Sequence, residues 1–145
     1  MKEFLDTALN IAETKGAEYA DIRISRHKNQ SIRTREDRIQ GISNSESYGF
    51  GVRVLVDGTW GFAASHRLTK NNVVKITMRA LEIARANRVV QRIPIRLAEV
   101  ESYVDQWSSP IKKDPFQVPV NEKIDLLLNV NAEALKVKGA KYCSS

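Results

Sequence analysis

The apolar positions at the start of the chain predict an amphipathic helix over about residues 2–15. They recur at helical spacing: Phe4, Leu5, Ala8, Leu9, Ile11 and Ala12. Gly16 follows as the stop, since glycine readily takes the left-handed conformation with which many helices end.

The period of the pattern then changes from helical spacing to two. Apolar and polar residues alternate over 20–25, which is typical of a half-buried strand. Residues 30–35 and 39–47 predict two weaker strands on either side of a turn at Glu36-Asp37.

The clearest strand covers residues 48–56, and Asp57-Gly58 separates it from a further β-rich stretch over 59–64. Asp-Gly at this place predicts a hairpin, because a type I′ turn needs positive φ at both of its central residues. Within the strand, Gly49-Phe50-Gly51 indicates close backbone approach or a bulge. A phosphate loop would need a third glycine leading into a helix, and here a strand continues.

Thr69 is the expected cap of a second helix, which ends near Asn87. Its apolar stripe is formed by five residues: Val73, Ile76, Ala80, Leu81 and Ala84. Residues 89–119 contain four prolines and no helical period, so they predict an extended connection. A third helix is expected over 120–138, with Gly139 as its stop. The last residues, 141–145, are typical of a strand that is beginning.

This order of elements predicts an α+β fold in one domain, residues 1–145. An N-terminal helix comes first, then antiparallel hairpins that form a sheet, then one long helix packed on the sheet. The Pro-containing connection and the C-terminal helix complete the domain.

Composition narrows the class of protein. The 145 residues have a net charge of +6 and are 42% hydrophobic, which excludes collagen, wholesale disorder and a disulfide scaffold. The single cysteine, Cys143, cannot form an internal disulfide or a multi-cysteine metal site. No apolar segment is long enough to span a membrane, and the first residues lack the apolar core of a signal peptide. We therefore expect a cytoplasmic protein that does not bind membranes.

Several segments together resemble the N-terminal domain of the TldD/PmbA family. The resemblance rests first on Gly16-Ala17-Glu18-Tyr19-Ala20-Asp21-Ile22-Arg23 and on the stretch from Ser45 to Ala63, with its Gly-Phe-Gly-Val-Arg-Val and Asp-Gly-Thr-Trp-Gly-Phe-Ala motifs. It continues through Leu68-Thr69, Arg79-Ala80 and Ile83-Ala84, and later through Trp107, Pro110, Asp114-Pro115-Phe116 and Glu122-Lys123. It extends over nearly the whole chain.

The resemblance implies a subunit of a zinc-dependent metallopeptidase, a kind of protein also called a modulator of DNA gyrase. The family's zinc motif, His-Glu-x-x-x-His, lies on a helix of a later domain, where the histidines bind zinc and the glutamate serves as general base. Neither His27 nor His66 begins such a motif. We therefore assign this chain no catalytic residue, no cofactor-binding residue and no metal ligand, and we expect the chain alone to be inactive.

The resemblance also implies the partners: a C-terminal catalytic domain, a homo- or heterodimer with a sister subunit, and a peptide substrate. Asn44, Ser45 and Glu46 are the candidate substrate edge, because peptidases often hold a substrate as an added strand. The two histidines are interpreted as loop residues and Cys143 as a plain small side chain. Trp60 and Phe62 are interpreted as core, and Trp107 as a wedge against the sheet or a partner domain.

Two alternatives remain open. The first is a basic nucleic-acid-binding module, suggested by six basic residues in the predicted first hairpin: Arg23, Arg26, Lys28, Arg33, Arg35 and Arg38. No aromatic residue lies among them to stack on a base, which argues against nucleic acid. The second is a stand-alone adaptor for a full-length family member, and the basic surface over 70–92 is a candidate partner face.

Overall fold

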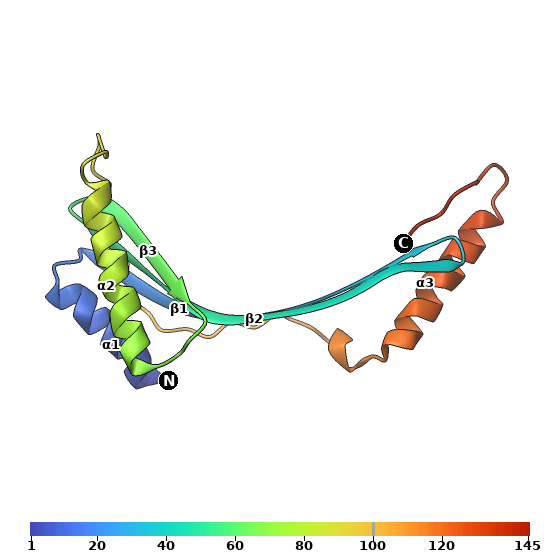
Figure 1. The fold of residues 1–145 in the computed structure, drawn as a ribbon, viewed down its shortest axis with the longest axis horizontal. Helices are drawn as coiled ribbons and strands as arrows, with labels where there is room; N and C mark the ends of the chain where they lie inside the picture. Colours follow the sequence, from blue (N-terminus) through green and yellow to red (C-terminus); the bar gives the residue numbers. More distant parts are fainter. Residues whose placement is uncertain (100) are drawn as a thin grey trace. The chain divides into compact units, whose positions relative to one another are not determined.

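The computed structural model describes residues 1–99 and 101–145 and shows the expected α+β fold (Figure 1). The elements in chain order are α1 (Lys2–Thr14), β1 (Tyr19–Arg35), β2 (Arg38–Val56), β3 (Thr59–Ser65), α2 (Lys70–Asn87), the short 3₁₀ helix η1 (Pro115–Gln117) and α3 (Val120–Leu135). The three strands form one antiparallel sheet in the order β1-β2-β3. None of the described helices is long and apolar enough to cross a bilayer.

β1 and β2 are far longer than the sequence pattern predicts. The two short strands expected over 20–25 and 30–35 form one strand of 17 residues, and those expected over 39–47 and 48–56 form one of 19. The prediction of separate strands is wrong because the polar stretches between them lack an apolar alternation. Pairing between the two strands satisfies the backbone N–H and C=O groups whatever the side chains are. Both strands therefore continue through these polar stretches.

The chain divides into two compact units, and both strands contribute to each. Unit 1 comprises Met1–His27 and Ser47–Ser102, and unit 2 comprises Lys28–Glu46 and Tyr103–Ser145.

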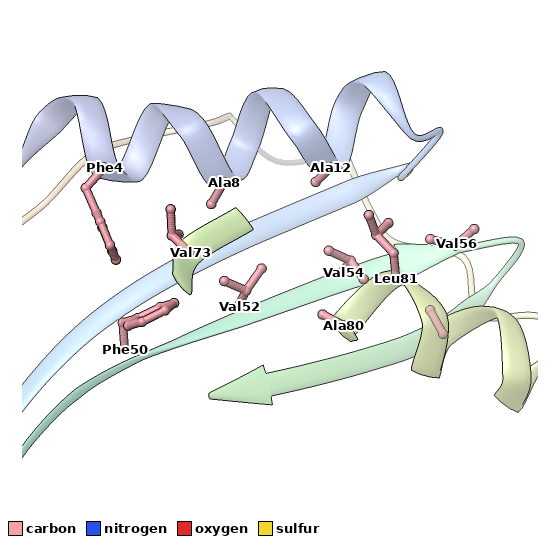
Figure 2. Packing of buried hydrophobic residues seen from close by; sticks show 11 residues of the cluster. Phe4, Ala8, Ala12, Phe50, Val52, Val54, Val56, Val73, Ala80 and Leu81 are labelled. Atoms are coloured by element: carbon pink, nitrogen blue, oxygen red, sulfur yellow. The ribbon is translucent and has the colours of Figure 1, made fainter. Parts of the chain in front are cut away.

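Unit 1 has the apolar core, in which α1 and α2 pack on one face of the sheet (Figure 2). Alternate residues of β2 point into this core: Phe50, Val52, Val54 and Val56, each at most 4% exposed. They meet the predicted stripe of α2 and the buried residues of α1. Phe4 lies edge-to-face against Phe50, with ring centroids 5.0 Å apart. Burial of each of these large apolar side chains contributes about 1.5–3 kcal/mol to the free energy of folding.

The predicted turn and cap signals of unit 1 are confirmed. Asp57 and Gly58 both have positive φ, 49° and 68°, as a type I′ hairpin requires. The Thr69 side chain accepts a hydrogen bond from the Asn72 amide at 3.3 Å and begins α2. Gly16, with φ of 83°, follows the end of α1.

Gly61 sets the distance between α2 and β3. A Cβ atom at this position would lie 1.9 Å from the Ala80 carbonyl oxygen and 2.6 Å from the Ala84 amide nitrogen. The helix backbone therefore lies directly on the strand, with no side chain between them. Because the obstacle is backbone and not a mobile side chain, only glycine fits here.

Unit 2 packs α3 beside the hairpin of residues 28–46, with little apolar burial. Ile124 is 9% exposed, while the two most buried residues in the unit are the polar Asn131 and Thr34. The predicted start of a strand after α3 is confirmed, since Ser144 forms an antiparallel bridge with Arg35. The connection before α3 is mostly irregular as expected, although η1 adds one helical turn within it.

The close approach at Gly61 makes a direct prediction. Replacing Gly61 with Ala should lower the free energy of unfolding by about 3 kcal/mol, because a Cβ must push α2 off the sheet. Gly41→Ala is the matched control, since the nearest atom to its Cβ would be an Arg33 guanidinium nitrogen 4.0 Å away. That change should alter stability by less than about 1 kcal/mol. Urea unfolding of both variants measures the difference, and equal stabilities would contradict the packing described.

Candidate functional site

The candidate substrate edge lies on β2 within an exposed stretch. Asn44, Ser45 and Glu46 are all exposed, and the Asn44 side-chain oxygen accepts a hydrogen bond from the Gln30 amide group at 2.9 Å. The ladder between β2 and β3 begins only at Phe50, which pairs with Ser65. The segment 44–46 therefore has β1 as its one neighbour in the described sheet, and its other side is a strand edge.

A second candidate site is a groove on the face of unit 1 that the helices leave uncovered. It is open to solvent and has a volume of about 580 Å³. Its floor is the β2 backbone around Gly49 and Gly51, and Tyr48 and Phe62 give it exposed aromatic edges, 45% and 58% exposed. Its size and mixed lining are typical of a binding groove.

Arg53 is the electrostatic centre of that face. Its guanidinium nitrogens lie 2.6 and 2.8 Å from one Asp21 carboxylate oxygen, and its carbon is 4.9 Å from the centre of the Trp60 ring. The hydrogen bond to Asp21 raises the pKa of Arg53 further above its usual value. Tyr19 completes the cluster edge-to-face against Trp60. Because Arg53 and Asp21 form an ion pair with each other, this cluster holds the wall of the groove in place.

The prediction that Phe62 belongs to the core is wrong. Strand alternation places Gly61 against α2, so Trp60 and Phe62 point to the opposite, helix-free face. Trp60 is half-buried there beneath Arg53, while the exposed Phe62 ring lies across Gly51, where an added Cβ would be 2.7 Å from the ring. An aromatic side chain that covers a cross-strand glycine shields the backbone that the glycine leaves bare.

The described residues contain no group of three or more His, Cys, Asp or Glu side chains that could hold a metal ion. His66 follows β3 in an exposed bend, as expected for a loop residue. His27 is exposed within β1, so its interpretation as a loop residue is wrong: the strand continues through it. Because a protein zinc site needs three or four such ligands, the residues of this chain described here do not fit zinc.

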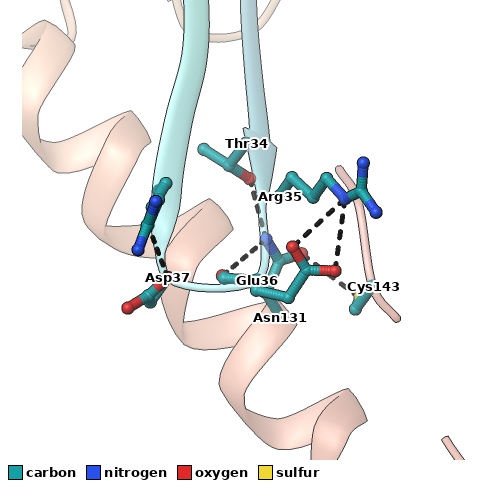
Figure 3. A network of polar contacts seen from close by, with 7 residues as sticks. Thr34, Arg35, Glu36, Asp37, Asn131 and Cys143 are labelled. Carbon is teal, nitrogen blue, oxygen red and sulfur yellow. Dashed lines mark hydrogen bonds and ion pairs between the residues drawn. The ribbon is translucent and has the colours of Figure 1, made fainter. Parts of the chain in front are cut away.

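Asn131 is the buried polar centre of unit 2, and the sequence analysis missed it (Figure 3). Its amide group donates to the Thr34 hydroxyl at 3.0 Å and to the Glu36 carbonyl oxygen at 3.1 Å. Its oxygen accepts from the Cys143 thiol at 3.3 Å and from the Ser145 hydroxyl at 2.9 Å. All four hydrogen-bonding positions of the side chain are therefore filled.

These contacts form a closed ring with a defined proton direction. Ser145 gives its single hydroxyl proton to Asn131, so the 2.9 Å contact between the Thr34 and Ser145 hydroxyls has Thr34 as the donor. The ring joins α3, β1 and the C-terminal segment. It also holds the turn, because the Asn131 bond fixes the carbonyl of Glu36, whose φ of 46° is unfavourable for a residue other than glycine.

Most basic residues singled out in the sequence have partners within the chain. In the hairpin region, Arg23 pairs with Asp21, Arg35 with Glu36 and Arg38 with Asp37. On α2, Lys70 pairs with Glu3, Arg79 with Glu82, and Arg85 donates to the Lys15 carbonyl oxygen. Lys70 also lowers the pKa of Glu3, mainly through their hydrogen bond and also through its positive charge. Exposed pairs of this kind are typical of a solvated surface.

Trp107 does not pack as a wedge against the sheet, because its side chain is 78% exposed. Tyr103 and Val104, earlier in the same connection, are 85% and 91% exposed. The connection therefore presents three large apolar side chains that nothing in the described chain covers.

Comparisons with known proteins agree with the resemblance that the motifs indicate. Residues 20–85 match the family model described as PmbA/TldA metallopeptidase domain 1. A metalloprotease of Methanocaldococcus jannaschii is 28% identical over 129 residues, which are 86% of this chain and 29% of the relative. A zinc metalloprotease TldD homolog of Saccharolobus solfataricus is 36% identical over 62 residues, 43% of this chain and 14% of the relative. The chain thus spans less than a third of either relative.

Solved structures show the same fold. A protein of Thermotoga maritima named as a modulator of a DNA gyrase superposes with a TM-score of 0.72 at 19% identity, over 99% of this chain and 31% of its own. TldE of Thermococcus kodakarensis gives a TM-score of 0.57 at 15% identity, over 92% of this chain and 28% of its own. The predicted resemblance to the TldD/PmbA N-terminal domain is confirmed.

The hydrogen-bonded ring predicts a large effect of one side chain. Asn131→Ala should destabilise unit 2 by about 3 kcal/mol, because the Glu36 carbonyl and the Thr34 and Ser145 hydroxyls lose buried partners. Asn129→Ala, at an exposed position of α3, is the matched control and should not destabilise. Amide hydrogen exchange at Thr34 and Ser145 reads out unit 2 directly. Unchanged protection in Asn131→Ala would show that the ring is not what holds the unit.

Proposed function

We propose that this chain, whose residues 20–85 match the first domain of the PmbA/TldA metallopeptidases, is the N-terminal scaffold and substrate-enclosure domain of such a peptidase. The complete protein hydrolyses peptide bonds, and residues outside this chain supply the zinc site. The match to the first domain carries the proposal. The names of the relatives, metalloprotease and zinc metalloprotease TldD homolog, support the chemistry.

The distribution of chemical groups in the chain supports a scaffold role. Zinc peptidases gather three protein ligands and a general base around one metal-bound water. Here the histidines are exposed singly, on β1 and after β3, and Arg53 and Asp21 are occupied with each other. These residues can shape a chamber and orient a peptide, but they do not supply the ligands of the metal.

Exposed apolar side chains support a docking role for the connection before α3. If another domain covers Tyr103, Val104 and Trp107, their apolar surface is removed from water. This burial favours association. We assign this surface to the C-terminal catalytic domain or to a sister subunit of a homo- or heterodimer. Its aromatic content is typical of interface cores.

The strand edge at Asn44, Ser45 and Glu46 is the proposed peptide contact. A substrate added here as a strand is held by main-chain hydrogen bonds, which suits a peptidase that acts on many sequences. The segment carries only polar side chains, so no bulky apolar group blocks the approach of a peptide.

The chain alone should bind less than one zinc ion per molecule and should cleave no peptide, because its residues do not assemble a zinc site. Metal analysis after dialysis and a cleavage assay on an unfolded peptide measure this, with a full-length family metallopeptidase as the positive control. One tightly bound zinc per chain, or cleavage that a chelator abolishes, would contradict the proposal.

Two proline variants test the substrate edge. Successive amides of a strand point to opposite sides, so one of Asn44→Pro and Ser45→Pro disturbs pairing with β1 and the other affects only the open side. The variant that keeps the circular dichroism spectrum of the parent should bind a labelled peptide of Gly, Ser and Thr about tenfold more weakly. Asn10→Ala in α1 is the control variant, because a proline at that position would break the helix. It should bind the peptide like the parent. Parent-like affinity of the folded proline variant would remove the assignment.

A further inference from the structure

The groove on the helix-free face of unit 1 carries a positive charge in excess. Among the described residues, two guanidinium groups line it, those of Arg23 and Arg53, but only one carboxylate, that of Asp21. Arg53 makes the close contacts to one oxygen of that carboxylate, at 2.6 and 2.8 Å, while the Arg23 Nε lies 3.4 Å from its other oxygen. Because one carboxylate balances one guanidinium, Arg23 supplies the excess charge.

We propose that this groove binds the last residue of a peptide, with its free α-carboxylate at Arg23 and an aromatic or large apolar side chain against Phe62. The ligand class is a short peptide with an apolar C-terminal residue. That the ligand is a peptide rests on the peptidase assignment above. The site itself is new, since it needs no zinc and uses no residue of the strand edge at 44–46.

Strand alternation brings Arg23 to the groove. Asp21 and Arg23 lie two residues apart on β1, so their side chains share one face of the sheet, and the ion pair of Asp21 with Arg53 identifies it as the helix-free face. The Arg23 side chain is 73% exposed, so a ligand can reach its terminal nitrogens. A guanidinium group presents several N–H donors in one plane and binds both oxygens of a carboxylate.

Phe62 supplies the apolar side of the groove. Its side chain is exposed, and its ring lies across Gly51 of the middle strand. The remaining gap to β1 is one interstrand spacing, about 4.8 Å. The α-carboxylate and the side chain of one residue are separated by a similar length. A single C-terminal residue therefore fits between Arg23 and Phe62.

The bend after β3, which bounds the groove, is already ordered. The Ser65 hydroxyl oxygen accepts hydrogen bonds from the Asn72 side-chain amide at 2.8 Å and from the Arg67 backbone amide at 3.2 Å. The Ser65 carbonyl oxygen lies against Gly49, where an added Cβ would be 2.8 Å from it. Binding therefore does not have to order this segment, which keeps its entropic cost low.

The charge of the groove favours a carboxylate over a phosphate group. The excess is one positive charge, and a carboxylate carries one negative charge. A phosphate monoester carries about −1.5 to −2 at neutral pH, so part of its charge would face the Asp21 carboxylate without compensation. The pair of Asp21 with Arg53 stays intact when a single negative charge binds at Arg23.

Arg23 and Phe62 also have simpler roles. An exposed arginine beside a carboxylate is typical of a solvated surface, and an aromatic ring over a cross-strand glycine shields the backbone. A solvated arginine attracts any small anion weakly, whatever group the anion carries. Dependence of binding on both the carboxylate and the apolar side chain of one ligand therefore distinguishes the proposal from these roles.

The test uses the tetrapeptide Gly-Ser-Thr-Phe, with a dye at its N-terminus and a free C-terminus, and measures fluorescence anisotropy with the full chain. The same peptide with a C-terminal carboxamide lacks the negative charge and should bind about tenfold more weakly. Gly-Ser-Thr-Ser with a free C-terminus lacks the apolar side chain and should also bind about tenfold more weakly. Equal affinity of either peptide would overturn the proposal.

Two kinds of competitor identify the source of the negative charge. N-acetylphenylalanine should displace the labelled peptide about tenfold less well than unlabelled tetrapeptide does, because a groove of about 580 Å³ has room for more than one residue. Inorganic phosphate and AMP, at matched ionic strength, should not displace it. Equal displacement by N-acetylphenylalanine would show that a free aromatic acid is the ligand, and displacement by phosphate or AMP would show a phosphate site. Either result would overturn the proposal.

Protein variants locate the site. Arg23→Gln should lower the affinity for the free-acid peptide about tenfold and leave that for the carboxamide unchanged, and Arg23→Lys should restore part of the loss. Phe62→Ser should weaken the binding of both peptides. Arg38→Gln is the matched control, because Arg38 is also exposed and lies 3.6 Å from its own carboxylate partner, but it does not line the groove. Parent-like binding by Arg23→Gln would overturn the proposal.

Chemical shifts in NMR spectra test the same site on the unaltered chain. The free-acid tetrapeptide should shift the backbone amides of Gly49 and Gly51, which form the floor of the groove, and leave those of α3 unchanged. Shifts confined to other parts of the chain would also overturn the proposal.

This result is separable from the peptidase assignment. The variant of Asn44→Pro and Ser45→Pro that stays folded should bind the free-acid tetrapeptide like the parent, since neither residue lines the groove. Loss of binding in that variant, with Arg23→Gln unaffected, would place the site on the strand edge and contradict the groove. The zinc and cleavage assays test the scaffold role whatever the outcome here.

Discussion

The antiparallel pairing of β1 with β2 is the interaction on which both compact units depend. Neither unit has a sheet of its own, because each is built on part of the same two strands. The pairing uses backbone groups, so it continues where the side chains change from apolar to polar. This constraint explains why strands of 17 and 19 residues persist through stretches with no apolar alternation.

The two units use this shared hairpin in different physical ways. Unit 1 buries apolar side chains, and Gly61 lets α2 lie directly on β3. Unit 2 buries few apolar groups and instead closes a hydrogen-bonded ring around Asn131. Such a ring stabilises when every group is paired, and it becomes costly when one partner is lost. The candidate sites lie in both units: the groove beside Tyr48 and Phe62 is in unit 1, and the strand edge at residues 44–46 and the exposed side chains of Tyr103, Val104 and Trp107 are in unit 2.

Local signals in the sequence predicted the elements they control. Asp57-Gly58 specifies its turn through φ, and Thr69 begins α2 through one side-chain hydrogen bond, so both could be predicted from a few residues. The full length of β1 could not be predicted, because its middle is held by pairing with β2 and not by its own pattern of apolar residues.

Phe62 was assigned to the core because it is aromatic and near Trp60. Its position follows from Gly61 facing α2, which is a tertiary contact. Asn131 had a signal, since it lies seven residues after Ile124 on the buried face of α3, but its partners come from three separate segments. The candidate edge at residues 44–46 could be proposed from the polarity of the segment alone.

Both compact units depend on a β1–β2 pairing that continues through the polar middle of the two strands. Amide hydrogen exchange, resolved by residue with NMR, tests this pairing most directly. Alternate amides over residues 26–32 of β1 face β2 and should exchange slowly, as the amides of buried Val52 and Val54 in the same sheet do. Uniformly fast exchange over residues 26–32, with Val52 and Val54 still protected, would contradict the continuous hairpin.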